Sequence, residues 1–265
     1  MTTVVTVMDR DGFDQCTDNI VVVQPERRRL LWVPRDLWCE EIGSRINAAF
    51  KAGGHDLLLR GLESLGIHAD HSVCLPRAAV ENVLDGVDVV VPVRAPVRLW
   101  YPLTPQSRIE DGRKEVDFEP PRETLHGERI HQWLGGRYER DPKARSSDFE
   151  RIERQQVFVR ALLRQRFDFS AVLDGEIEPA ISSRAAVDDL RRVRRWWRFS
   201  CLNHVVDRRI EGNRVLILQS SRPRPSRRRR RAVALIKRLK GGSPGSEDHR
   251  SGYTADPNTS HLRGS

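Results

Sequence analysis

Short runs of β-branched residues alternate with segments whose apolar residues recur at helical spacing, and this alternation constrains the fold more than any other feature. Residues 4–8, 20–24 and 30–33 read as strands bounded by turn residues. Residues 46–65 have the apolar spacing of a helix, and Gly53-Gly54 divides it into two pieces. Strands that alternate with helices predict an α/β fold. We therefore expect an αβα-type domain around a central mixed sheet.

The second half of this domain has the same character but longer polar stretches. The apolar run 87–92 predicts a strand inside a buried sheet, and the proline-containing stretch 103–124 predicts a long surface loop. Helices are expected over 148–166 and 187–199, and a last strand over 214–218. Within RRVRRWWRF, we expect one tryptophan to be buried and the flanking arginines to be solvated.

The positive charge of the chain is concentrated at its C-terminal end. Residues 221–265 carry 12 Lys/Arg and 3 Asp/Glu, which accounts for the whole net charge of +9. We therefore divide the chain into a folded domain, residues 1–218, and a basic tail, residues 219–265, which is too charged and too poor in apolar residues to fold alone. A neutral domain argues against nucleic acid as the partner. The stretch RRRRRAVALIKRLK instead suits peripheral contact with an anionic membrane.

Other signals exclude several classes of protein. The four cysteines are widely spaced and form no CxxC pair, which argues against a zinc site or a disulfide framework. The chain has no apolar run long enough for a transmembrane helix and no secretory signal, so the sequence read by itself indicates a soluble cytosolic protein.

Four segments carry possible chemistry: an acidic pair, VPRD, INAAFKAGG and SDFERIERQQ. The acidic pair is Asp9 and Asp18, and VPRD contains Arg35. In the last segment Asp148, Arg151 and Arg154 recur at intervals of three, so they would share one helix face, either in a site or as a salt-bridged solvated face. Each segment alone is weak evidence, and their order along the chain is the stronger signal.

In this order the segments resemble the LytR–CpsA–Psr family of cell-envelope glycopolymer phosphotransferases. The resemblance rests on the acidic pair, PRD at 34–36, INAA followed by Gly-Gly at 46–54, GVDV at 86–89, LHGE at 125–128 and DFERIERQQ at 148–156. It implies a transferase that moves a glycan from a polyprenyl pyrophosphate carrier onto peptidoglycan. It also implies a cell-envelope location and an apolar channel for the lipid tail.

The resemblance also assigns roles to residues. It implies catalytic roles for Arg35, Arg137, Asp148 and Arg151, and pyrophosphate binding by Arg35, Arg137, Arg151 and Arg154. Arginine suits this task because its planar fork binds phosphate oxygens bidentately. Asp9 and Asp18 would hold Mg²⁺ or Mn²⁺, since carboxylates without a cation would repel pyrophosphate.

Three departures from the family pattern leave alternatives open. Gly135 stands where the first arginine of an R-x-R pair is expected, Trp133 replaces a tyrosine, and the domain begins almost at Met1, where an anchoring helix is usual. Arg140 is a possible substitute for the missing arginine. The alternatives to an active enzyme are a non-catalytic protein that binds polyprenyl phosphate and a nucleic-acid-binding regulator that acts through its basic tail.

Overall fold

The computed structural model describes residues 1–9, 16–104, 107–136, 138–140, 148–167, 169–173, 177–202, 205–210 and 213–218. Contacts divide the chain into two compact units, Met1–Ser220 and Ser221–Ser265, and all described residues belong to the first. The predicted tail, and with it the prediction that it is disordered, therefore lies outside the described residues.

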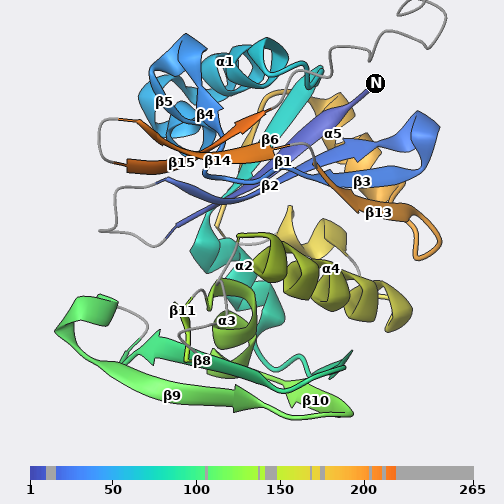
Figure 1. The fold of residues 1–265 in the computed structure, drawn as a ribbon. Coiled ribbons are helices and arrows are strands. Elements are labelled where there is room, and N and C mark those ends of the chain that lie inside the picture. Colours follow the sequence, from blue (N-terminus) through green and yellow to red (C-terminus); the bar gives the residue numbers. More distant parts are fainter. Residues whose placement is uncertain are drawn as a thin grey trace, which may run out of the picture. The chain divides into compact units, whose positions relative to one another are not determined.

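A six-stranded mixed sheet organises the first unit (Figure 1). Its strand order is β12 (Ala180–Ile181), β6 (His71–Leu75), β1 (Thr3–Met8), β2 (Thr17–Gln24), β3 (Arg29–Trp32) and β13 (Arg198–Cys201). The β1–β6 and β3–β13 pairs are parallel, and the other pairs are antiparallel. The predicted α/β fold with a central mixed sheet is confirmed.

Helices cover both faces of this sheet because each central strand is apolar on both sides. Val4, Val22 and Leu31 pack with the α1 helix (Ala49–Ser64) in one core cluster. Their strand neighbours Val23 and Leu30 face the other way. They pack with residues of α4 (Asp148–Arg164) and of the segment that follows α5 (Arg184–Arg191). The alternation follows from the two-residue period of a strand.

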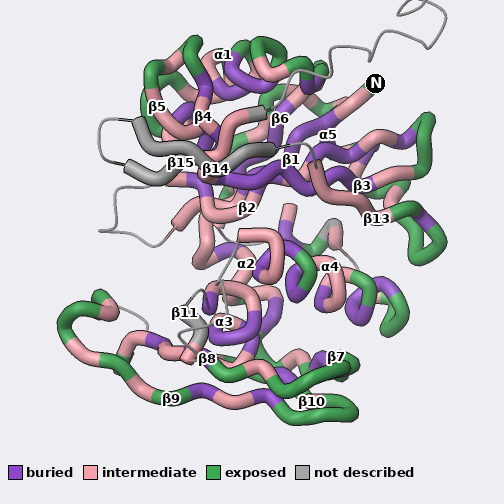
Figure 2. Tube along the Cα trace, in the orientation of Figure 1, coloured by how far each residue is buried: buried purple, intermediate pink, exposed green. Residues whose placement is uncertain are grey.

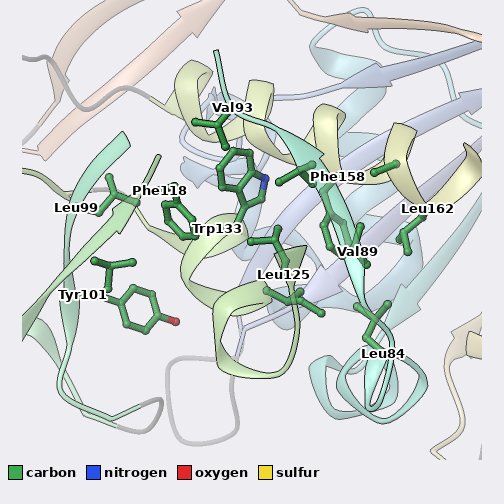
Figure 3. Close-up of a cluster of buried hydrophobic side chains, with 14 residues drawn as sticks. Leu84, Val89, Val93, Leu99, Tyr101, Phe118, Leu125, Trp133, Phe158 and Leu162 are labelled. Carbon is green, nitrogen blue, oxygen red and sulfur yellow. The ribbon is translucent and has the colours of Figure 1, made fainter. Parts of the chain in front are cut away.

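A third core cluster lies away from the central sheet, around α3 (Glu128–Gly135) and α4 (Figure 3). Two small sheets contribute to it: β7 (Val89–Pro92) with β10 (Arg122–Leu125), and β11 (Tyr138–Glu139), β8 (Val97–Pro102) and β9 (Arg113–Phe118). The α2 helix (Arg77–Leu84) adds Leu84 to the same cluster. Figure 2 shows that the strands of this region alternate between buried and more exposed residues.

Short elements complete the unit. Two-stranded ladders join β4 (Trp38–Cys39) with β5 (Ser44–Arg45), and β14 (Val205–Ile210) with β15 (Asn213–Leu218). The 3-10 turns are η1 (Pro25–Arg27), η2 (Glu40–Ile42), η3 (Ile46–Ala48), η4 (Ile109–Asp111) and η5 (Phe169–Val172). The predicted break in the first long helix is confirmed, since Gly53 and Gly54 have non-helical backbone angles inside α1. All four cysteines are free thiols, and two of them, Cys39 and Cys74, are buried.

Three local predictions were wrong. The stretch 103–124 is not one loop, because Val116 and Phe118 alternate with polar residues and bury one face of β9. The run 87–92 is not inside a buried sheet: its strand, β7, begins at Val89, the only described partner of this strand is β10, and Val90 is 46% exposed. The helix predicted over 187–199 ends at Arg191, and the end of that segment, from Arg198, begins β13, which extends the central sheet beside β3.

Candidate phosphate and lipid site

The acidic pair meets where β1 ends and β2 begins. Met8 lies opposite Thr17 in the antiparallel ladder, so Asp9 and Asp18 are placed at the same end of the sheet. The backbone N–H of Asp9 donates to the carbonyl of Cys16 at 2.7 Å, which holds Asp9 beside the start of β2. Both side chains line one polar cavity of about 430 Å³.

Arg35 reaches this pair from the segment that follows β3. Its side chain is 9% exposed and forms an ion pair with Asp18 through Nη1, which lies 4.0 Å from Asp9 Oδ2. The backbone N–H of Arg35 donates to Asp148 Oδ2 at 3.2 Å, and its carbonyl accepts from the N–H of Asn47 at 3.3 Å. The backbone around Arg35 is therefore fixed from α4 and from η3.

Arg151 lies beneath this cluster, on α4. Its Nη1 donates to Asp18 Oδ1 at 2.7 Å, and its Nη2 and Nε donate to Asp148 Oδ1 at 2.5 and 3.1 Å. Burial alone would lower the pKa of Arg151, but the charges of Asp18 and Asp148 raise it above its ordinary value. The contacts link Arg35, Asp18, Arg151 and Asp148 in a closed ring, which we call the charge ring.

The charge ring decides between the two interpretations of the Asp148 and Arg151 spacing. The two residues do form a salt bridge at i, i+3, but Arg151 is 1% exposed and its pair faces Asp18 instead of solvent. A buried arginine held by two carboxylates fixes the positions of both acids. In this arrangement Arg151 is a positioning residue, and its predicted contact with substrate remains a prediction.

Arg77 also belongs to the site, although no sequence pattern indicated it. It is the first residue of α2 and donates to Glu81 Oε1 at 2.6 Å, with its Nη1 3.9 Å from Asp9 Oδ1. Burial lowers the pKa of Arg77, but the hydrogen bond and charge of Glu81 outweigh this and raise it. Its place follows from topology: β6 runs parallel to β1, so the residues after both strands meet at one edge.

Two adjoining cavities give the site its character. Arg35, Arg45, Arg77 and Arg108 line the polar cavity together with the acidic pair. A second cavity of about 250 Å³, almost wholly apolar, lies between the central sheet and the helices α2, α3 and α4. Asp18, Arg77 and Gly135 line both, so the apolar cavity adjoins the charged one at these residues. This pair of cavities suits an amphiphile with an anionic head and a long apolar tail.

The other predicted arginines have different positions. Arg154 is buried and donates to the backbone carbonyls of Trp133 (3.0 Å) and Gly136, so it ties α4 to the end of α3 and lines a separate cavity. Arg140 pairs with Glu115 and Asp117 of β9 at 2.7 and 2.6 Å. Arg137 lies outside the described residues. The substrate-binding roles predicted for Arg137 and Arg154 remain predictions.

Asp9 and Asp18 could bind a divalent cation, but two carboxylates do not complete its coordination, so further ligands must come from other molecules. Carboxylate oxygens are ligands that Mg²⁺ prefers, and both side chains line the same cavity. Among the described residues no group of three or more histidine, cysteine or acidic side chains is placed to hold a metal. Two protein carboxylates would leave the remaining positions to phosphate and water oxygens, which is usual for Mg²⁺ beside phosphate.

Fold and site together define an α/β protein in which an arginine-lined polar cavity adjoins an apolar one. The model of the LytR_cpsA_psr family matches residues 9–186, so the chain belongs to the LytR–CpsA–Psr family. Membership in this family supports a general role as a transferase of cell-wall glycopolymers. No protein of curated function matches the chain by sequence.

Solved structures have the same fold at low sequence identity. TagT of Bacillus subtilis is 18% identical, with a TM-score of 0.54 over 90% of this chain and 88% of that chain. The structure of TagT (YwtF) with bound octaprenyl pyrophosphate lipid is 17% identical, with a TM-score of 0.54 over 83% and 84% of the two chains. A protein of Streptococcus agalactiae is 15% identical, with a TM-score of 0.61 over 91% and 86%.

None of the helices among the described residues has the length and apolar character needed to cross a membrane.

Proposed function

We propose that this protein transfers a glycan phosphate from a polyprenyl pyrophosphate carrier to a hydroxyl of peptidoglycan, in the cell envelope. The observation that carries the proposal is the pair of adjoining cavities, apolar on one side and arginine-lined on the other. The isoprenoid tail would lie in the apolar cavity and the pyrophosphate beside Arg35 and Arg77. The TagT structure with bound octaprenyl pyrophosphate supports the same class of ligand.

In the proposed transfer, the arginines and the carboxylates of the site have different roles. Arg35 and Arg77 neutralise the phosphate oxygens, on which negative charge is concentrated during phosphoryl transfer. Asp9 accepts the proton of the attacking hydroxyl, because its side chain is 24% exposed and its contacts with Arg35 and Arg77, at 4.0 and 3.9 Å, are longer than the 2.7 Å contact of Asp18 with Arg151. Oxygen of the acceptor bonds to the glycan-bearing phosphorus, the bridging P–O bond breaks, and polyprenyl phosphate leaves with the electron pair.

Asp9 and Asp18 are the residues that would hold Mg²⁺ or Mn²⁺. When bound, the cation supplies further neutralisation of phosphate charge. Arg151 and Asp148 keep Asp18 and the backbone of Arg35 in place.

A second candidate is a protein that binds polyprenyl phosphate without transferring it. Gly135 favours this reading, since it lines both cavities and contributes no side chain where the family pattern has an arginine.

A transfer assay with a lipid-linked glycan donor and peptidoglycan fragments separates the candidates. We expect release of polyprenyl phosphate by the wild-type protein, and a loss of roughly a hundredfold or more in Arg35→Ala. Arg60→Ala, at an exposed site on α1, is the matched control. Donor binding without turnover would establish the second candidate. Turnover that is unaffected by Arg35→Ala would overturn the mechanism.

A further inference from the structure

Arginines are concentrated at the end of the central sheet that lies opposite the charge ring. Arg27 and Arg28 lie in the turn before β3, Arg29 is the first residue of β3, and the segment 191–198 leads into β13 (Figure 1). Together residues 25–29 and 191–198 contain eight arginines and one acidic residue, Glu26. We call these eight the arginine rim: Arg27, Arg28, Arg29, Arg191, Arg192, Arg194, Arg195 and Arg198.

The two segments of the rim lie side by side. The backbone N–H of Arg198 donates to the carbonyl of Arg28 at 2.8 Å, and Arg198 is the register partner of Arg29. Burial lowers the pKa of Arg29, and the like charges of Arg27 and Arg198 lower it further. Seven of the eight side chains are exposed, all but Arg29, and Figure 2 shows both segments on the surface. The rim is therefore a concentrated positive surface.

One large aromatic side chain stands in the middle of this charge. Trp196 is 64% exposed, whereas its neighbour Trp197 is 7% exposed and packs in the core with Ile152. The prediction that one tryptophan of the pair is buried is thus confirmed. An exposed tryptophan among arginines is a combination found at membrane–water interfaces, where the ring lies at the level of the headgroups.

The apolar cavity extends toward the rim. Asp18 and Asn19 line the cavity where β2 begins, and Val23 and Leu30 line it about 17 Å further along the sheet at a strand's rise per residue. Leu190 and Val193, which flank Arg191 and Arg192, line it as well. The rim thus adjoins the end of the cavity that is remote from the phosphate site.

We propose that the arginine rim and Trp196 form a membrane-docking surface that binds anionic phospholipid headgroups. Positive charge attracts an anionic bilayer, and the tryptophan adds interfacial contact that a purely ionic partner would not need. The docking surface does not depend on phosphoryl transfer. That an isoprenoid tail passes between the bilayer and the adjoining cavity does rest on the proposed function.

Binding of the full chain to vesicles tests the surface by comparing variants that all keep the same basic tail, residues 219–265, so a difference between them belongs to the substituted arginines. The probes are vesicles of phosphatidylglycerol mixed with phosphatidylcholine, and of phosphatidylcholine alone. We expect Arg27→Glu with Arg195→Glu to weaken binding to the anionic vesicles by roughly tenfold or more. The matched control is Arg94→Glu with Arg122→Glu, two exposed arginines of the β7 and β10 region, which should leave binding nearly unchanged.

Brominated lipids give a readout at Trp196 itself. We expect them to quench part of the tryptophan fluorescence of the wild-type protein, and expect this part to be absent from Trp196→Phe. Vesicle binding that is equal in the rim variant and the wild type would overturn the proposal. So would unchanged quenching in Trp196→Phe. Binding of a DNA duplex that depends on the rim and is not displaced by anionic vesicles would assign the surface to nucleic acid instead.

Discussion

At the scale of single residues, the charged side chains of the site differ in burial: some are enclosed in the protein, and others remain accessible from the polar cavity. Asp18 accepts from Arg35 and Arg151, and Arg151 is enclosed completely. Arg77 and Asp9 keep part of their surface in the polar cavity. We expect the enclosed Arg151 to fix the geometry of the site and the accessible side chains to contact a ligand, so substitutions in the two groups should differ in their effects.

Arg151→Leu tests the buried group. Removing this arginine leaves Asp18 and Asp148 with less compensation for their burial, so we expect the free energy of unfolding to fall by roughly 3–5 kcal/mol. Arg60→Leu is the control: Arg60 is 59% exposed and pairs with Glu41 at 3.6 Å, and its loss should cost less than about 1 kcal/mol. Denaturant unfolding measures both, and equal effects would contradict the structural role of the charge ring.

Gly135→Arg tests the accessible group. A Cβ at Gly135 would have no atom within 4 Å, so the mouth of the two cavities has room for a side chain. Another cation there should tighten binding of a polyprenyl pyrophosphate by about tenfold, whereas Gly135→Ala should leave it unchanged. Calorimetric titration measures the affinities. Weaker binding of the lipid by Gly135→Arg would show that further positive charge where the two cavities meet does not favour binding.

The buried thiol of Cys74 gives a pH dependence of known sign. Burial raises its pKa from 9.0 to about 11, with a smaller opposing effect from a hydrogen bond with Thr6. The unfolded chain therefore loses this proton at lower pH than the folded one, and stability is lost between about pH 9 and 11. Wild type should lose about 2 kcal/mol more than Cys74→Val over this range. Parallel curves of unfolding free energy against pH would contradict the assignment.

At the scale of elements, periodicity in the sequence was sufficient to predict the central strands and the helices α1 and α4, because each has a regular apolar pattern. It was insufficient to predict the strands β9 and β13. The aromatic end of RRVRRWWRF fits the apolar face of either a helix or a strand, and pairing with β3 decides the outcome. Arg77 was missed for a related reason: its position beside Asp9 depends on the parallel pairing of β1 and β6.

The break in α1 makes the stability of the protein depend on the glycine at position 54. Gly54 has φ 61° and ψ −150°, a region that is essentially restricted to glycine. Because a Cβ there would meet nothing within 4 Å, the effect of Gly54→Ala comes from the backbone alone. We expect a loss of about 1–3 kcal/mol in unfolding free energy, and almost none for Ala52→Ser on the same exposed surface. Equal stability of the two variants would contradict the kinked helix.

At the scale of the whole molecule, the last described hairpin connects the C-terminal side of the domain to the site. Leu216 packs against the core cluster beneath α1, and its N–H donates to the carbonyl of Asp36 at 3.0 Å. Asp36 follows Arg35 directly, and Leu37 forms a β-bridge with Leu216. The hairpin thus supports the segment that presents Arg35.

Two truncations test this dependence and the domain boundary together. A chain that ends at Ser220 keeps every described contact, so its free energy of unfolding and its affinity for a polyprenyl pyrophosphate should match those of the full chain. A chain that ends at Gly212 loses β15 and the support of Leu216, and should lose roughly 2–5 kcal/mol of stability, as large core truncations do, together with affinity for the lipid. Denaturant unfolding and lipid titration measure the two effects. A large loss of stability on truncation at Ser220 would place the boundary further along the chain, and unchanged affinity on truncation at Gly212 would show that Arg35 is held without the hairpin.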